Sequence, residues 1–340
     1  MSKEKSRKLC DSELIISGSD KKEHNDMILN IMGNCFPFLT LRRAKYQENL
    51  ETPAQKLENI QLNSEDFISA LSANKNSWAI CQENTISLYS DFVSTTFWNS
   101  QDRVRSLLLT DELLYAGCKN IEVYQLNGQE ICKLVGHDRP VNSFDVKGGF
   151  LMSGGGDWSV RLWDVGRGVE VSKGIINWNV VTCIKWIDEH TAVQASEDLR
   201  IRLWDIRTGK VSERDSIGVG ENFATCLDAC GSFVISGHRG FNSNGCEVKK
   251  WDLRVPSCLS TARGHEMPVE SVKFCNNLIF SCGKDGKIVK YSDSLKILET
   301  YSHPNSKPFI SMDTFKDGLI LANIEPRVVY FTLNPLTQNF

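Results

Sequence analysis

Hydrophobic and polar residues alternate in short runs along most of this chain, and one such run recurs three times with nearly the same letters. The runs SVRLWDVG, RIRLWDIR and EVKKWDLR contain the dipeptides Trp163-Asp164, Trp204-Asp205 and Trp251-Asp252. Alternation with a period of two residues is typical of a β-strand that buries one face. We therefore expect a β-strand at each of these places, within a unit that is repeated along the chain.

The spacing of the three runs predicts the architecture. Trp204 follows Trp163 by 41 residues and Trp251 follows Trp204 by 47. Outward from these marks, weaker copies of the run place another aromatic residue at matching distances: Tyr89, Tyr124, Tyr291 and Phe331. A period near forty residues with a closing Trp-Asp is the signature of a WD40-type propeller. Seven copies predict an all-β, seven-bladed β-propeller.

Closure of the predicted ring needs a strand from the other end of the chain. Only nine residues follow Phe331, too few for a turn and a fourth strand. A sheet left with an open edge exposes unpaired backbone groups. We expect the alternating segment 56–62, KLENIQL, to supply the outer strand of the last blade. The predicted domains are then an N-terminal extension, 1–55, and a propeller, 56–340.

A buried hydrogen-bond network is expected in several units. In WD40 repeats a His before the innermost strand bonds to an Asp in the turn ahead of the Trp strand, and a Ser and the Trp complete the network. The matching residues are His137, Ser153, Asp157 and Trp163, then His265, Ser281 and Asp285, with Asp198 left in the fourth unit without its His.

The combination of Ser, His and Asp also invites a hydrolase interpretation. A nucleophilic Ser must be exposed beside a base and an oxyanion pocket, whereas these serines lie on strands inside a blade. The constellation recurs, which a catalytic site would not do. We expect a non-catalytic protein, with no cofactor and, because the six histidines are scattered, no metal site.

The composition of the chain limits the kinds of partner we expect and the compartment in which the protein would work. The net charge is -3 with both signs interspersed, so no basic groove for nucleic acid is expected. Twelve cysteines occur without a Cys-x-x-Cys pair, which favours a reducing, cytoplasmic setting. No run reaches the roughly eighteen apolar residues of a membrane span.

One rim of the propeller is the expected site for a protein or peptide partner. Connections into innermost strands and turns before Trp strands emerge on the same rim, and they carry side chains of the types that dominate interfaces. The surplus length before Trp251 falls in the turn 238–246, a Gly- and Asn-rich flap. The candidate residues are Arg139, Trp158, Trp178, Arg200, Arg239, Phe241, Met267 and Arg327. Packing of Trp158 and Trp178 on adjoining loops is the alternative.

The opposite rim offers a rival function. Trp204-Asp205-Ile206-Arg207 and Trp251-Asp252-Leu253-Arg254 match the core of the WDxR motif by which some propellers dock on the adaptor of cullin-RING ubiquitin ligases. Arg207 and Arg254 could form charge-assisted hydrogen bonds there. The alternative function is therefore a substrate receptor of such a ligase, and a solvent-facing Arg in a tight turn is the simpler interpretation.

The stretch from about 140 to 275 resembles the WD repeat-containing protein 31 family. GDWSVRLWDVGRG, QASEDLRIRLWD and the insertion GFNSNGCEVKKWDLR at 240–254 carry the resemblance. Members are linked to ciliary trafficking and act without catalysis. The resemblance therefore implies a cilium-associated adaptor that regulates trafficking.

The N-terminal extension has no repeat character, and its first thirty residues are polar and charge-balanced, consistent with disorder. It contains Met32-Gly33-Asn34-Cys35. If translation began at Met32, Gly33 could be myristoylated and Cys35 palmitoylated, and two acyl chains would anchor the protein to a membrane. As written Gly33 is internal, and Pro37 stands where the consensus has Ser or Thr. The alternative is a short apolar segment that packs on the propeller.

Overall fold

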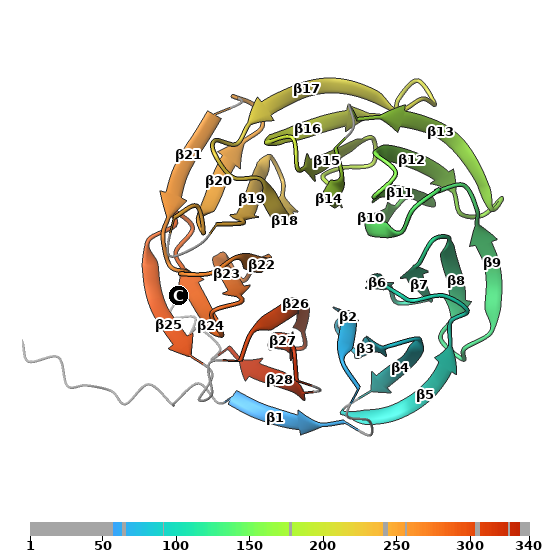
Figure 1. Cartoon of the computed structure of the whole chain (residues 1–340), viewed down its shortest axis with the longest axis horizontal. Coiled ribbons are helices and arrows are strands. Elements are labelled where there is room, and N and C mark those ends of the chain that lie inside the picture. The colour runs from blue at the N-terminus through green and yellow to red at the C-terminus, as the bar shows by residue number, and fades with distance from the viewer. Residues whose placement is uncertain are drawn as a thin grey trace, which may run out of the picture. The chain divides into compact units, whose positions relative to one another are not determined.

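The computed structural model describes residues 57–62, 66–90, 92–176, 179–240, 244–255, 257–302, 307–325 and 327–333. All of them belong to the unit Pro53–Phe340. They form seven four-stranded antiparallel sheets, arranged as blades in a ring (Figure 1). The predicted fold class, an all-β seven-bladed propeller, is confirmed. No helix among the described residues is long and apolar enough to cross a membrane.

In blades 1 to 6 the strands lie in chain order from the centre outward, and in blade 7 the first three strands do so. The innermost strands of blades 1 to 7 are β2 (Ile68–Ala73), β6 (Ser106–Leu109), β10 (Val141–Lys147), β14 (Val181–Trp186), β18 (Ala224–Cys230), β22 (Val269–Cys275) and β26 (Phe309–Phe315). The second strands are β3 (Ser77–Gln82), β7 (Leu113–Gly117), β11 (Phe150–Gly155), β15 (Thr191–Ser196), β19 (Phe233–His238), β23 (Leu278–Gly283) and β27 (Gly318–Asn323).

The third strands carry the Trp-Asp runs and their copies. They are β4 (Thr85–Ser90), β8 (Ile121–Gln125), β12 (Ser159–Asp164), β16 (Arg200–Asp205), β20 (Val248–Asp252), β24 (Lys287–Tyr291) and β28 (Arg327–Thr332). The outermost strands are β5 (Val93–Asn99), β9 (Glu130–Leu134), β13 (Val169–Ile175), β17 (Ser212–Gly218), β21 (Ser257–Ala262), β25 (Ile297–Ser302) and, in blade 7, β1 (Leu57–Gln61).

Blade 7 is built from both ends of the propeller sequence. Strand β1 pairs antiparallel with β28, from Leu57 opposite Phe331 to Gln61 opposite Arg327. Ile60 packs against the apolar cluster shared by blades 7 and 1. Strand β1 thereby pairs the outer edge of β28, so the backbone groups on that edge are hydrogen-bonded and blade 7 has four strands like the other blades.

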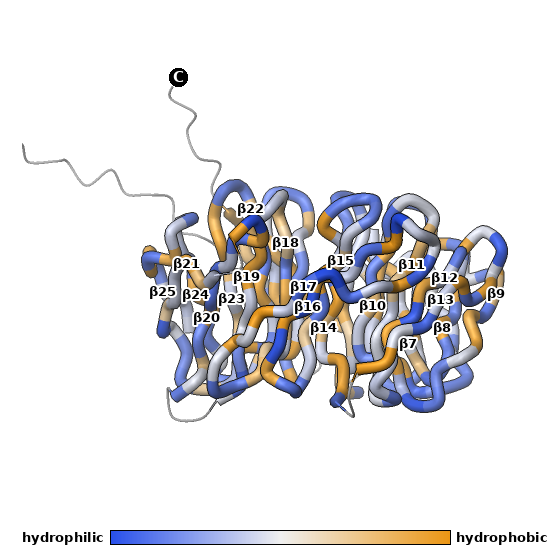
Figure 2. Tube along the Cα trace, turned by 90° about the horizontal axis from the view of Figure 1, so that it is seen from above, coloured by the Kyte–Doolittle hydropathy of each residue, from blue (hydrophilic) through white to orange (hydrophobic). Residues whose placement is uncertain are grey.

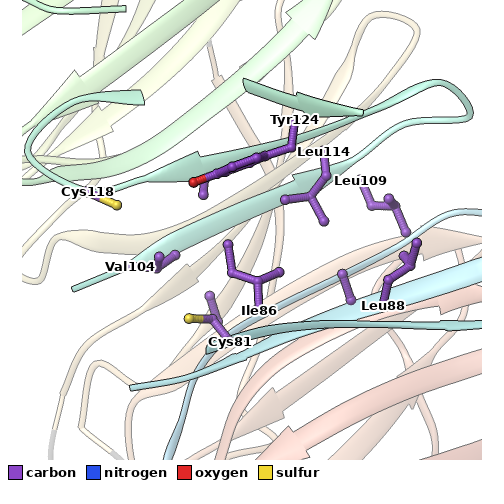
Figure 3. Close-up of a cluster of buried hydrophobic side chains, with 11 residues drawn as sticks. Cys81, Ile86, Leu88, Val104, Leu109, Leu114, Cys118 and Tyr124 are labelled. Carbon is purple, nitrogen blue, oxygen red and sulfur yellow. The ribbon is translucent and has the colours of Figure 1, made fainter. Parts of the chain in front are cut away.

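Seven apolar clusters hold the ring together, one between each pair of neighbouring blades. Figure 3 shows the cluster between blades 1 and 2, where Ile86 and Leu88 face Leu114 and Tyr124. In each cluster the aromatic residue of a third strand packs on the preceding blade, as Trp163 does on blade 2. A Tyr or Phe therefore performs the packing role of Trp in four blades.

Polar side chains of the innermost strands also join the blades. Asn142 donates a hydrogen bond to the Val181 carbonyl oxygen (2.9 Å), and Thr182 donates to that of Ala224 (2.6 Å). A carboxylate of one blade can cap a backbone amide of the next: the Trp186 amide donates to Asp145 (2.9 Å). Hydrogen bonds therefore connect the innermost strands of neighbouring blades along the inner wall of the ring.

The ring has two rims, seen edge-on in Figure 2, where polar residues predominate in the connections. We call upper rim the side that holds the connections into innermost strands and the turns between second and third strands. The lower rim holds the turns between first and second strands and between third and fourth strands.

Candidate functional site

The structure brings the four network residues of blade 3 together. His137 Nδ1 lies 2.9 Å from both carboxylate oxygens of Asp157, and its Nε2 lies 2.7 Å from Ser153 Oγ. Trp163 Nε1 donates to the same Ser153 hydroxyl (2.8 Å). His137, Ser153 and Trp163 are buried. The connection from blade 2 is thus pinned to the upper-rim turn of blade 3.

Blade 6 repeats the arrangement with a Tyr. His265 Nδ1 lies 3.0 Å from Asp285 and its Nε2 lies 2.6 Å from Ser281 Oγ. The Tyr291 hydroxyl lies 3.1 Å from the Ser281 hydroxyl and occupies the place of the indole N–H. The phenol therefore keeps the hydrogen bond as well as the ring.

Blade 4 keeps Asp198 but pairs it differently. Asp198 accepts hydrogen bonds from Ser196 and from Arg202, and Arg202 Nε also donates to Glu213 (3.2 Å). In blade 3, Arg161 bridges Asp157 and Glu170 in the same way. Sequence reasoning missed both arginines, although each stands two residues before its Trp.

Blade 5 contains a third network that sequence reasoning missed. His238 Nε2 lies 2.8 Å from Ser236 Oγ, and Trp251 Nε1 donates to the same hydroxyl (2.8 Å). This His ends the second strand instead of preceding the innermost one. Burial lowers the pKa of His238 to about 4, so the ring is neutral near pH 7.

Blade 2 replaces the His network with a buried carboxylate. Glu122 accepts hydrogen bonds from Tyr124 (2.6 Å), Ser100 (2.7 Å) and Lys133 (3.1 Å). Burial opposes its charged form, but these hydrogen bonds outweigh it, and the pKa of the Glu122 carboxyl is lowered. Nothing in a Trp-Asp pattern signals this substitution.

These networks hold the blades and do not present reactive groups. The Ser153, Ser236 and Ser281 side chains are completely buried, and each hydroxyl is engaged by a His and an aromatic partner. Catalysis by a Ser requires access to substrate and an oxyanion pocket. Among the described residues, no group of three or more His, Cys, Asp or Glu side chains could hold a metal ion.

The inner strands enclose a cavity of about 220 Å³ at the centre of the ring. Lys185 lies 3.9 Å from Asp145 and Lys273 lies 2.8 Å from Asp313 on its wall. Burial disfavours the charged Lys273, yet Asp313 and Asp228 outweigh it and raise its pKa. The charged residues that line the cavity have both signs: Arg105, Lys185, Lys273, Glu270 and Asp313.

The candidate upper-rim residues are placed as follows. Arg139, Arg200, Arg239 and Arg327 are exposed, while Trp158 and Met267 are half-buried. Trp178 and Phe241 lie outside the described residues, as do Gly33 and Cys35. The flap predicted at 238–246 is described only at its two ends.

Two of these arginines stack on aromatic rings. The Arg139 guanidinium carbon lies 5.6 Å from the centroid of the Trp158 ring, and that of Arg239 lies 5.9 Å from the Phe223 ring. Cation–π contact at an exposed site contributes roughly 0.5–1 kcal/mol. It helps to position the two guanidinium groups at the surface.

The turns of blades 3 and 4 hold large apolar residues in a conformation that favours glycine. Trp158 and Leu199 have φ angles of 63° and 64°, and both precede the third strand directly. Blade 6 has Gly286 at the same place, with φ 71°. A left-handed conformation costs a residue with a Cβ roughly 1–2 kcal/mol. The backbone of these turns therefore does not explain the choice of Trp and Leu.

Further apolar exposure lies beside these turns. Ile175, opposite Ser159 at the upper end of β13, is 71% exposed. The matching positions of blades 1, 4 and 6 hold Asn99, Gly218 and Ser302. We call Arg139, Trp158, Ile175, Leu199 and Arg200 the Trp158 surface.

The lower-rim arginines differ in their partners. Arg254 forms two hydrogen bonds with Asp252, two residues earlier (2.9 and 2.7 Å), and Arg207 lies 3.8 Å from Asp205. Arg167 of blade 3 likewise lies 3.6 Å from Asp164. Each guanidinium faces a carboxylate of its own strand, although all three side chains remain largely exposed.

Comparison with known proteins supports WD40 repeats and the propeller. The WD40 family profile, described as WD domain, G-beta repeat, matches residues 128–164 and 256–292. The WD40 β-propeller domain of Doa1 superposes with a TM-score of 0.71 and 23% identity, covering 82% of this chain and 97% of that one. This likeness concerns the fold.

Curated relatives are distant and have diverse roles. Eukaryotic translation initiation factor 3 subunit I of Nematostella vectensis is 26% identical over 228 residues, which are 62% of this chain and 68% of that protein. Nuclear distribution protein PAC1 of Zygosaccharomyces rouxii is 25% identical over 174 residues, 46% of this chain and 38% of that protein. THO complex subunit 3 of Arabidopsis thaliana is 24% identical over 209 residues, 58% of this chain and 61% of that protein.

Proposed function

We propose that this chain is a non-catalytic scaffold or adaptor that binds other proteins through its upper rim. The observation that carries the proposal is the backbone of Trp158 and Leu199, two large apolar residues held at positive φ beside exposed arginines. Residues retained at such a cost are typical of functional surfaces. Trp and Arg are also the residue types that dominate interface energetics.

The cellular role follows from the sequence resemblance. The insertion GFNSNGCEVKKWDLR resembles the WD repeat-containing protein 31 family, which supports a cilium-associated adaptor that acts in trafficking. Acylation at Gly33 and Cys35 would add a membrane tether to a cytoplasmic protein. The intact mass of the native protein tests this tether: an acylated chain beginning at Gly33 supports it, and the unmodified 340-residue chain refutes it.

The lower rim supports a second candidate, a substrate receptor of a cullin-RING ubiquitin ligase. Arg207 and Arg254 are 61% and 65% exposed at their side chains, which leaves donors for an adaptor. Their ion pairs with Asp205 and Asp252 compete with such a contact. We therefore favour the upper rim.

One experiment separates the two candidates. Tagged full-length protein is purified from ciliated cells beside two variants, Trp158→Ala/Trp178→Ala/Phe241→Ala and Arg207→Ala/Arg254→Ala, and copurifying proteins are quantified by mass spectrometry. The scaffold proposal expects partners to be lost from the first variant and kept by the second. Loss of a ligase adaptor from the second alone would favour the receptor, and full retention by the first variant would refute upper-rim binding.

A further inference from the structure

We infer that the Trp158 surface binds an acidic, extended peptide segment that carries a large apolar side chain. The inference rests on the proposed function and specifies the chemistry of the partner. On the upper rim of two neighbouring blades, this surface combines large apolar residues directly before the third strands with arginines whose guanidinium groups have no carboxylate partner among the described residues.

The apolar part is held in place by matching backbone hydrogen bonds. The Ile176 amide donates to the Trp158 carbonyl oxygen (2.8 Å), and the Val219 amide donates to that of Leu199 (2.9 Å). Both turns are thus tied to the connection that leaves their own blade. Trp158 and Leu199 are presented by a fixed backbone, and a partner does not have to order these turns when it binds.

The cationic part is available to carboxylates from outside. Among the described residues, no carboxylate oxygen lies within 4.0 Å of a guanidinium nitrogen of Arg139 or Arg200, although Asp198 accepts a hydrogen bond from the Arg200 backbone amide. Asp138 and Glu197, the exposed acidic residues nearest in the chain, make no such ion pair with them. The lower-rim arginines Arg167, Arg207 and Arg254 all have one.

The two guanidinium groups are nevertheless positioned. Arg139 stacks over the Trp158 ring, and Arg200 Nη1 donates to Ser216 Oγ (2.9 Å). A guanidinium has five N–H donors, so most remain for a partner. Bidentate pairing with a carboxylate combines charge with direction. A segment with carboxylates near a large apolar side chain would therefore match a surface that presents Arg139 on Trp158 and Arg200 next to Leu199.

The test uses peptides of random sequence. A displayed library of random 12-residue peptides is selected on immobilised full-length protein, and the enriched peptides are synthesised and measured by fluorescence anisotropy. We expect enrichment of Asp and Glu around a Leu, Phe or Trp. The same peptides should bind at least tenfold more weakly to Trp158→Gly/Leu199→Gly and to Arg139→Glu/Arg200→Glu.

The control is Arg167→Glu/Arg207→Glu, which makes the same change of charge on the lower rim and should leave the affinity within twofold. Because glycine suits the positive φ of both turns, Trp158→Gly/Leu199→Gly should melt no lower than the wild type. Peptides that depend on Trp158 but show no acidic preference would overturn the inference and leave the proposed function standing. Absence of any enriched peptide that depends on these residues would count against both.

Discussion

Removal of one buried hydroxyl, in Ser153→Ala, should destabilise the propeller more than its size suggests. Ser153 Oγ accepts the Trp163 indole N–H (2.8 Å) and lies 2.7 Å from His137 Nε2. Both partners are buried, so water cannot replace the hydroxyl without opening the blade. A buried polar group without a partner costs about 1–3 kcal/mol. Two such groups give an expected loss of about 2–6 kcal/mol in the free energy of unfolding.

The assay is thermal and urea unfolding followed by circular dichroism. For a domain of this size each kcal/mol lowers Tm by about 2–4 °C, so a decrease of roughly 4–24 °C is expected. Ser257→Ala, which removes an exposed hydroxyl from an outermost strand, is the matched control and should change Tm by less than about 1 °C.

A double-mutant cycle identifies the cause. Trp163→Phe removes the indole donor, so Ser153→Ala should cost less in that background than in the wild type, by about 1 kcal/mol. Additive losses would mean that the two groups do not interact. A Tm for Ser153→Ala within about 1 °C of the wild type would refute the network as a source of stability.

Three further outcomes are expected. Ile60→Asp should lower the free energy of unfolding by about 2 kcal/mol, because Ile60 packs between blades 7 and 1. The control Asn59→Asp, on the exposed side of β1, should leave it unchanged. If the two variants had the same melting curve, closure of the ring by β1 would be contradicted. Burial would raise the pKa of Asp157 and Asp285, but the hydrogen bonds with His residues outweigh it and lower both pKa values. The resulting stability is complete above the ordinary Asp pKa near 4 and should be lost as pH falls below it; a flat stability between pH 5 and 3 would contradict this. Thr182→Val should cost about 1 kcal/mol in urea unfolding through loss of its bond to the next blade, and an unchanged midpoint would exclude that role.

The sequence predicted the elements that depend on periodicity. An aromatic residue about every forty positions predicted seven blades, because each aromatic side chain packs on the preceding blade. This holds for Tyr291 and Phe331, which are not followed by Asp, as it does for the Trp-Asp pairs. The alternation in 56–62 indicated a strand before any partner for it was known, and the structure pairs residues 57–61 of it with β28.

The spacing of the repeats did not predict residues that take over the role of a different residue type in another blade. Glu122 performs in blade 2 the role that His and Asp perform in blade 3, and no local pattern marks a lone Glu as buried. Leu199 was missed because a Leu before an alternating strand suggests core. Only the backbone angle and the 36% exposure of Leu199 show that it faces outward.

Site-specific photocrosslinking shows whether partners bind the upper rim. A photoreactive phenylalanine analogue is placed at Trp158 or Leu199 on the upper rim, or at Thr208 in a lower-rim turn, and the full-length protein is irradiated in cells. If partners bind the upper rim, both upper-rim positions should give covalent adducts with the same partner proteins, and position 208 should give none. Adducts from position 208 alone would contradict binding at the upper rim.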